Sequence, residues 1–463
     1  MNTLRGVSSR MAQTDVPCIV QMQQMLRGKS DILSLAQGIV HWPPPEAALA
    51  AGRNAMSEAD TSLYGADDGM PALRAALVEK LRVDNGLTGS DVMVTAGANQ
   101  AYTNVVLTLM DARDSVLLYR PYYFNHLMAH QMTGSASQLV LPNAGVDLQP
   151  DLGALRAELE GRAERGEAQL AMVTLCNPGN PTGVMIPRAT LEEASDLCRS
   201  HGVWLVVDNT YEHFAYDGEA AHECIEGEHI VNIFSFSKAY GMMGWRVGYI
   251  AHPPSLGTEL LKAQDTIAIC PSIASQKVAL GALSPGRAWV SERVAGLGEQ
   301  KRLVLDALAP LGSGAVKGGS GAIYLFCKLK GMLRCATPAN PCAAATAYAT
   351  HPRHRSARAA PPPSRDWAPL SLPMLRPGIE DDMAAVRYLV EEHGVCLIPG
   401  SACGMPGHVR VCYANLPLEK TREAAKRLRA GLEALSSNAV DLSAYAAPPA
   451  ADGHASSKRP RPK

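Results

Sequence analysis

A lysine, two serines and an arginine follow an apolar, strand-like run that begins at Asn232. The serines are Ser235 and Ser237, the lysine is Lys238 and the arginine is Arg246. Burial penalises the charged form of a lysine, and the neutral amine is the form that attacks an aldehyde. The hydroxyls and the guanidinium would bind an anion beside that amine. An imine-forming lysine next to a phosphate site indicates pyridoxal phosphate as the cofactor.

A second part of the phosphate site is predicted where a strand ends at Thr95 and a helix opens. Ala98 and Asn99 lie at this helix start, where small residues let backbone N–H groups and the helix dipole approach a phosphate. The segment lacks the glycine spacing of a dinucleotide fingerprint. Together with Ser235, Ser237 and Arg246, it would complete a site for one phosphate monoester.

Asp208 stands at the end of a fully apolar run and is followed closely by Tyr211. A buried carboxylate is costly unless it pairs with a cation. A protonated pyridine nitrogen is such a cation, and keeping it protonated makes the ring a better electron sink. Tyr211 would then reach the phenolic oxygen of the ring. The alternative is an aspartate that caps a helix N-terminus.

Asn180 and Tyr123 are candidates for two further contacts with the ring. Asn180 belongs to the segment 177–183, in which two Asn-Pro pairs and two glycines form a rigid turn. That turn would hold the amide where it can donate to a ring oxygen, unless the segment is only a turn. Tyr123, after Pro121, can stack on a flat heterocycle, although an ordinary core aromatic cluster would have the same pattern.

Arg410 and the segment around Gly38 are the candidate substrate contacts. Arg410 is flanked by apolar strand residues, which suits bidentate capture of a carboxylate, although a partly exposed strand arginine is the alternative. Gly38 permits a close backbone approach. Ile39 and Trp42 beside it favour a pocket for an apolar or aromatic side chain, unless Trp42 simply packs in a proline-rich linker. No second arginine suited to a dicarboxylate is evident.

Short β-branched runs alternate with amphipathic helices between residues 71 and 251. This pattern predicts an α/β fold with a largely parallel sheet covered on both faces, in which ligands bind beyond the carboxyl ends of the strands. After about residue 261 the pattern is helical, and a second α/β unit follows, with strands at 322–329 and 410–413. In the first unit the predicted strands are 91–95, 115–119, 138–141, 169–175, 203–208, 229–235 and 247–251.

The domain division follows from these patterns and from composition. Residues 1–43 are expected to form an N-terminal arm that joins the small domain, and 44–290 a large cofactor-binding domain. Residues 291–331 and 378–435 would form the small domain. The segment 332–377 is rich in Ala, Pro, Arg and Ser with almost no periodicity, so we expect a disordered insertion. A disordered tail is expected over 436–463.

Composition excludes some classes of function. Lys+Arg number 43 and Asp+Glu 44, so no basic field exists to attract nucleic acid or an anionic membrane. No apolar run reaches the roughly 20 residues that span a bilayer. The 11 cysteines are scattered and form no Cys-x-x-Cys pair, which favours a reducing compartment and predicts no metal site. We expect a cytoplasmic protein.

The segments 180–183, 208–211 and 235–246 together resemble the most specific motifs of the fold-type I, class I and II aminotransferases. The resemblance covers essentially the whole chain except the insertion and the tail. It implies a large domain with a mostly parallel seven-stranded sheet between helices, and a smaller α/β domain. It also implies ping-pong transamination with pyridoxal phosphate, in which the freed amine of Lys238 moves the substrate α-proton.

The resemblance assigns a role to each candidate position. Lys238 would form the imine, Asp208 would bind the pyridine nitrogen, and Tyr123 would stack on the ring. Tyr64 corresponds to a tyrosine that reaches the phosphate from a partner subunit, which implies a homodimer. The phenolic oxygen would be bound by Asn180 and Tyr211, the phosphate by Ala98, Asn99, Ser235, Ser237 and Arg246, and the substrate carboxylate by Gly38 and Arg410.

A closer similarity is to the plant aromatic aminotransferases that act on methionine and indole-3-pyruvate and tune auxin and aromatic amino-acid pools. It rests on segments 34–45, 121–125 and 234–249, and has no counterpart for 332–377. We expect transfer from an aromatic or methionine-type amino acid to a 2-oxo acid such as indole-3-pyruvate, phenylpyruvate or pyruvate. The alternatives are an aspartate or kynurenine aminotransferase, a cysteine-conjugate β-lyase, or a non-catalytic cofactor-binding regulator. A dinucleotide oxidoreductase would leave Lys238 and Asp208 without a role.

Overall fold

The computed structural model describes residues 6–135, 138–216, 218–329, 382–437 and 440–446. The predicted insertion at 332–377 lies outside the described residues, as does most of the predicted tail. Residues 442–445 of that tail form a short 3-10 turn, and its Tyr445 packs edge-on against Tyr388 with ring centroids 5.4 Å apart. No helix in the described ranges is long and apolar enough to cross a membrane.

A seven-stranded sheet forms the larger part of the fold, with the strand order β2-β8-β7-β6-β5-β3-β4. β8 runs antiparallel to both of its neighbours, and the other adjacent pairs are parallel. The predicted α/β class and the mostly parallel sheet are therefore confirmed, and each predicted strand agrees with an observed one to within one residue at either end. The strands are β2 (Asp91–Thr95), β3 (Ser115–Leu118), β4 (Gln138–Val140), β5 (Leu170–Cys176), β6 (Trp204–Asp208), β7 (Ile230–Ser235) and β8 (Gly248–His252).

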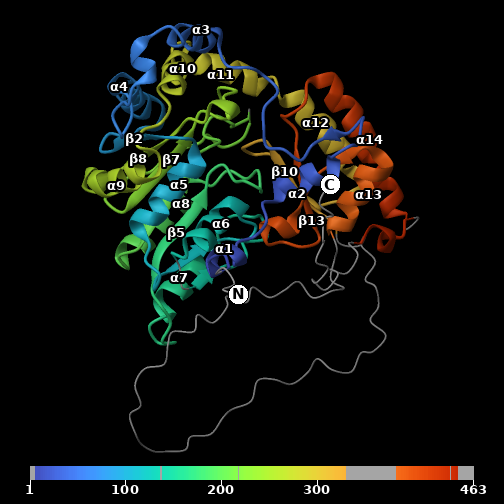
Figure 1. The fold of residues 1–463 in the computed structure, drawn as a ribbon. Helices are drawn as coiled ribbons and strands as arrows, with labels where there is room; N and C mark the ends of the chain where they lie inside the picture. Colours follow the sequence, from blue (N-terminus) through green and yellow to red (C-terminus); the bar gives the residue numbers. More distant parts are fainter. Residues whose placement is uncertain (1–5, 136–137, 217, 330–381, 438–439, 447–463) are drawn as a thin grey trace, which may run out of the picture.

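Alternate residues of the central strands face two separate hydrophobic cores. In β6, Val206 packs in the core beneath α5, α6 and α9, whereas Leu205 and Val207 pack in the core beneath α7 and α8. Helices therefore cover both faces of the sheet (Figure 1), which explains why its inner strands read as continuous apolar runs rather than as alternating ones. These helices are α5 (Ala98–Leu109), α6 (Phe124–Thr133), α7 (Leu152–Gly161), α8 (Arg188–Ser200) and α9 (Gly257–Ala268).

A smaller, four-stranded antiparallel sheet has the order β12-β13-β10-β9. The helices α12, α13 and α14 gather around β10 and β13, beside the larger sheet (Figure 1). The two predicted strands of this unit, 322–329 and 410–413, overlap β10 and β13. The elements are α12 (Gly298–Ala307), β9 (Val316–Gly318), β10 (Tyr324–Lys328), α13 (Asp382–His393), β12 (Ile398–Pro399), β13 (His408–Cys412) and α14 (Leu418–Ser436).

The N-terminal segment packs against the part of the chain that holds the smaller sheet. β1 (Leu33–Ser34) pairs in parallel with β11 (Val395–Cys396), and His41 N donates to the carbonyl of Ala414 at 3.0 Å. Two helices, α1 (Ser9–Gln13) and α2 (Cys18–Leu26), precede β1. They are separate because Pro17 stands directly before α2, where proline cannot continue a helix that precedes it.

The remaining helices line the side of the large sheet next to β2 or lead toward the smaller sheet. The predicted large-domain limit at residue 290 falls inside one of them, α11, and the domain limits stay predictions. These helices are α3 (Glu46–Ala55), α4 (Pro71–Lys80), α10 (Ile273–Leu283) and α11 (Gly286–Ala295).

Candidate active site

The carboxyl ends of β5, β6 and β7 lie side by side, because these strands are parallel neighbours. The polar segments that follow them therefore meet at one edge of the sheet. They border a cavity of about 550 Å³. All of the predicted site residues except Trp42 and Tyr64 line this cavity. Its walls are formed by Ile19, Gln37, Gly38, Ile39, Ala98, Asn99, Tyr123, Phe124, Cys176, Asn180, Asp208, Thr210, Tyr211, Ser235, Ser237, Lys238, Arg246, Tyr324 and Arg410.

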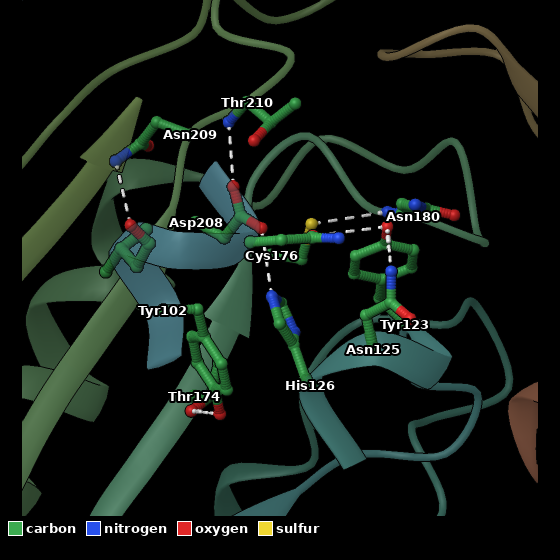
Figure 2. A network of polar contacts seen from close by, with 12 residues as sticks. Tyr102, Tyr123, Asn125, His126, Thr174, Cys176, Asn180, Asp208, Asn209 and Thr210 are labelled. Atoms are coloured by element: carbon green, nitrogen blue, oxygen red, sulfur yellow. Dashed lines mark hydrogen bonds and ion pairs between the residues drawn. The ribbon is translucent and has the colours of Figure 1, made fainter. Parts of the chain in front are cut away.

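Asp208 is buried at the end of β6, with both carboxylate oxygens hydrogen-bonded (Figure 2). His126 Nε2 lies 3.0 Å from Oδ2, and the backbone N–H of Thr210 donates to Oδ1 at 2.9 Å. Burial acts to raise the pKa of Asp208, but the bonds from His126 and Thr210 outweigh it and leave this pKa below its usual value. A permanent negative charge is therefore held at the cavity wall.

His126 was missed by the sequence analysis, although it contacts Asp208 directly. It lies on α6, one turn after Tyr123, and its ring stacks on that of Tyr102 with centroids 4.2 Å apart. The hydroxyl of Tyr102 in turn bonds Thr174 at 2.9 Å and His130 at 3.0 Å. This buried network fixes the orientation of His126 and, through it, of the Asp208 carboxylate.

Lys238 lies where the chain leaves β7, and its side chain borders the cavity. Burial, together with the positive charges of Arg246 and Arg410, lowers its pKa to about 8, although Cys412 and Asp208 act in the opposite direction. A much larger fraction of this amine is thus neutral near pH 7 than of an ordinary lysine. The sequence predicts that burial penalises the charged form of Lys238, because this residue follows a buried strand. The structure shows the same buried environment.

This pKa predicts how fast the cofactor-free protein takes up pyridoxal phosphate. Because the neutral amine reacts, the uptake rate should rise about tenfold per pH unit below pH 8 and level off above it. Stopped-flow absorbance of the cofactor between pH 6 and 10 measures this profile. A rate that keeps rising to the ordinary lysine value of 10.5 would contradict the lowered pKa.

Arg246 and the start of α5 border the same cavity, as the predicted anion site requires. Arg246 donates to the carbonyl of Met243 at 2.8 Å and lies 3.4 Å from the hydroxyl of Ser237. α5 begins after Gly97, which has a φ of 87° and provides no side-chain cap, so its N-terminal N–H groups are directed at the cavity. A Cβ atom on Gly97 would collide with the guanidinium of Arg246. Only glycine therefore allows this approach.

Arg410 is buried on β13 and connects the two sheets. Its guanidinium donates to Asn180 Oδ1 at 2.8 Å and to the carbonyl of Ala36 at 2.7 Å, and lies 4.3 Å from the ring centroid of Tyr324. Nε of Arg410 has no hydrogen-bond partner within the described residues. Because Asn180 accepts with its oxygen, its amide nitrogen remains to donate to a ligand.

Tyr211 and Tyr324 share a hydrogen bond between their hydroxyls at the cavity wall. Burial and the adjacent Tyr324 raise the pKa of Tyr211 well above its usual value, so the hydroxyl stays neutral and can donate. Tyr324 was not among the predicted site residues. Gly38 faces it so closely that a Cβ atom would collide with the Tyr324 hydroxyl. The predicted close approach at Gly38 is thus made by Tyr324.

Trp42 does not line the cavity, against the prediction. It is buried, its ring stacks on Phe214 at 6.3 Å, and its Nε1 donates to the carbonyl of Ala239 at 3.2 Å. An aromatic side chain in a proline-rich segment either borders a pocket or fills the core, and here it fills the core next to Lys238. Tyr64 also lies outside the cavity and is 81% exposed.

Comparison with known proteins identifies the family to which this arrangement belongs. The family profile described as Aminotransferase class I and II matches residues 30–428. The chain belongs to this family. It is similar to Aromatic aminotransferase ISS1 of Arabidopsis thaliana, with 43% identity over 94% of this chain and 98% of that protein.

This aminotransferase is also similar to aspartate-type relatives. It is 27% identical to the Aspartate/prephenate aminotransferase of Thermus thermophilus, over 92% of this chain and 98% of that protein. A solved structure of Thermus thermophilus aspartate aminotransferase, a double mutant, has 25% identity and a TM-score of 0.73 over 92% of this chain and 100% of its own. The two proteins therefore share the same overall fold.

Class I and II aminotransferases of this kind use pyridoxal phosphate, and the cavity fits that group. The uncapped start of α5 and Arg246 suit a phosphate, and the charged Asp208 suits a protonated ring nitrogen. Thr210 borders the cavity, and its buried hydroxyl Oγ1 has no hydrogen-bond partner among the described residues. A ligand in the cavity would satisfy it.

A buried ion pair anchors the segment that carries Asp208 and Tyr211. Glu212 Oε2 lies 2.5 Å from Lys80 Nζ, and Asn85 Nδ2 donates to the same oxygen at 2.7 Å. Both charged side chains are less than a tenth exposed. Lys80, at the end of α4, thus ties that helix to the end of β6.

Glu212→Gln should lower the free energy of unfolding by about 3–5 kcal/mol, because it leaves the buried Lys80 charge uncompensated. Burial acts to raise the pKa of Glu212, but Lys80 and the nearby histidines lower it to about 2. The stability from this lowered pKa is present above the unfolded value of 4.5 and is lost as pH falls toward 2. Urea denaturation at pH 7 and pH 4 measures both effects. Glu259→Gln, which changes an exposed pair on α9, is the control, and equal stability of both variants would contradict the prediction.

Proposed function

We propose that this enzyme transfers the amino group of an aromatic or methionine-type amino acid to a 2-oxo acid such as indole-3-pyruvate, phenylpyruvate or pyruvate. The observation that carries this proposal is the distribution of charge in the cavity. Among the described residues that line it, the cations are Lys238, Arg246 and Arg410. With Arg246 at the phosphate and Arg410 at the α-carboxylate, none remains for a second substrate carboxylate.

The wall beside the α-carboxylate position is apolar. Ile19 from α2 and Ile39 from the segment after β1 border the cavity together with Phe124 at the start of α6. Such a wall favours an aromatic or thioether side chain by the burial of apolar surface. The similarity to the Arabidopsis protein named Aromatic aminotransferase ISS1 supports the same assignment.

Bound pyridoxal phosphate supplies an electron sink that stabilises negative charge at the substrate α-carbon. We propose that Lys238 holds the cofactor and then, as the free neutral amine, removes the α-proton. Asp208, oriented by His126, would hold the proton on the ring nitrogen. Asn180 and Tyr211 would donate to the phenolic oxygen.

Other chain residues would position the cofactor and the substrate. Tyr123 would lie against the ring face, and its hydroxyl accepts from Asn125 Nδ2 at 2.8 Å, which fixes its orientation. Arg410 would bind the α-carboxylate in the space beside Gly38. The phosphate would be bound by Ala98, Asn99, Ser235, Ser237 and Arg246.

We further propose a homodimer in which Tyr64 of each chain reaches the phosphate of the other. In a single chain Tyr64 and the adjacent Leu63 are 81% and 66% exposed, which is unusual for neighbouring large apolar side chains.

The cytoplasm is the compartment we propose, because the nine described cysteines are free thiols. A role in methionine, tryptophan and auxin pools follows if indole-3-pyruvate is an acceptor.

A panel of amino donors and 2-oxo acid acceptors tests the substrate. We expect kcat/KM for Phe, Trp and Met to exceed that for Asp by at least about tenfold, the discrimination expected from one apolar pocket. An enzyme for which Asp is the best donor would be an aspartate aminotransferase, the activity named for the relatives at 25–28% identity.

Size-exclusion chromatography with light scattering tests the proposed homodimer.

A further inference from the structure

The segment that carries the cofactor contacts separates two cavities of nearly equal size. Its first part, with Asp208 and Tyr211, borders the cavity of about 550 Å³ described above. Its continuation, with Glu212, His213 and Tyr216, borders a second cavity of about 530 Å³. The opposite wall of this second cavity is formed by α11 and α12, including Arg287, Ser291, Lys301, Arg302 and Asp306.

The wall from α11 and α12 presents basic side chains. Arg302 is paired with Asp306 at 3.1 Å, whereas Arg287 and Lys301 form no ion pair within 4.0 Å in the described part of the chain. The Lys301 ammonium donates to the carbonyl of Gly319 and lies 4.6 Å from the ring centroid of Tyr216. An ammonium has three donors, so Lys301 retains donors for a ligand. Burial lowers its pKa, and the nearby Glu219 opposes this.

The floor of the second cavity carries one carboxylate, Glu212, and two histidines. The charge of Glu212 is compensated by Lys80, whose ammonium lies 2.5 Å from Oε2. His213 and His222 are neutral at pH 7, because burial lowers the pKa of each to about 4 despite the opposing effect of Glu212. His213 Nε2 is buried, lies 3.4 Å from Glu212 Oε1 and makes no hydrogen bond with any part of the chain that the structure describes. Neutral imidazoles can donate to an anion without repelling a cation.

We propose that the second cavity is a binding site for a small oxyanion, which Arg287 and Lys301 bind from one side and an imidazole of the floor from the other. The ligand is of the phosphate or carboxylate class, since guanidinium and ammonium donors suit both. The cavity is large enough for such an anion together with its hydration water.

Occupancy of this site reaches the active site through two short chains of contacts. His222 lies 3.0 Å from Asn209 Oδ1, and Asn209 directly follows Asp208. Tyr216 accepts a hydrogen bond from Tyr413 at 2.9 Å, on the strand end that follows Arg410. An anion that draws His222 toward α11 therefore acts, through Asn209, on the segment that carries Asp208. An anion that draws Tyr216 acts, through Tyr413, on the strand end near Arg410.

Isothermal titration calorimetry of the holoenzyme with inorganic phosphate, and separately with malonate, tests the proposal. In the holoenzyme the cofactor's own phosphate fills the site at Arg246, so added phosphate reports on the second cavity. We expect saturable binding of at least one of these anions. Arg287→Gln, at an exposed position, should weaken it at least about tenfold, and Arg287→Gln with Lys301→Gln should abolish it.

The matched control is Arg429→Gln, which changes an exposed arginine on α14 paired with Glu433 and should bind like the wild type. Binding of phosphate alone identifies a phosphate site, and binding of malonate alone a carboxylate site. In either case the visible absorption of the cofactor should shift with the same saturation midpoint. Absence of binding by the wild type at millimolar concentration, or equal binding by Arg287→Gln, would overturn the proposal.

Discussion

Replacing Lys238 with alanine should remove transamination almost completely and leave a protein without the yellow colour of the holoenzyme. The variant lacks both the amine that holds the cofactor and the base that we assign to the α-proton. Loss of a positioned proton-transfer group alone costs about 10²–10⁴-fold in rate. Because the side chain contacts the cavity rather than the core, the fold should survive. Initial rates with the preferred donor and the visible spectrum measure both effects.

Lys262→Ala is the matched control for this experiment. Lys262 lies on α9, is 67% exposed and pairs with Glu259, so its removal should change neither rate nor colour. Recovery of part of the lost rate by added small primary amines would support the assignment of Lys238 as the proton acceptor. A Lys238→Ala variant that is coloured and active would contradict the assignment.

Asp208→Asn should lower kcat by about 10²–10⁴-fold while KM for the amino donor changes little. The substitution keeps the size of the side chain but removes the charge that pairs with the ring nitrogen. Breaking a buried ion pair by removing one partner costs about 3–5 kcal/mol, and each 1.36 kcal/mol is tenfold in rate. Steady-state kinetics at pH 7 measures the loss, and circular dichroism verifies the fold.

The control is Asp196→Asn, an exposed aspartate on α8 that pairs with Arg199. A second variant, His126→Asn, separates charge from orientation. It leaves the Asp208 carboxylate in place but replaces the ring that lies 3.0 Å from Oδ2. We expect a smaller loss of kcat than for Asp208→Asn. A variant Asp208→Asn with the wild-type kcat would show that the ring nitrogen needs no carboxylate.

The parts of the site that could be predicted lie at the ends of parallel strands. Asp208, Asn180 and Lys238 each follow an apolar run in the sequence, and parallel strands place such positions at one edge of the sheet. The strand limits were predictable for the same reason, because strands buried on both faces read as short apolar runs between turn residues. Local sequence therefore determines which groups meet here.

The parts that were missed depend on contacts between distant segments. His126 lies on a helix and is 82 residues from Asp208, so no local spacing relates the two. Tyr324 comes from the smaller sheet and reaches Gly38 only after both sheets have packed together. Trp42 was predicted to line the cavity, but it packs in the core beside it. An aromatic side chain has the same sequence pattern in both environments.

The pairing of β1 with β11 has a consequence for the order in which the nascent chain folds. The seven strands of the large sheet are complete once residue 252 has left the ribosome, whereas Leu33 must await Val395, and Ala36 must await Arg410, 374 residues later. Such non-local closures form late, because they carry the largest loop-closure entropy. The segment that contains Leu33 and Ala36 is thus synthesised long before it can be fixed, and the cavity wall that carries Arg410 matures only after the large sheet is complete.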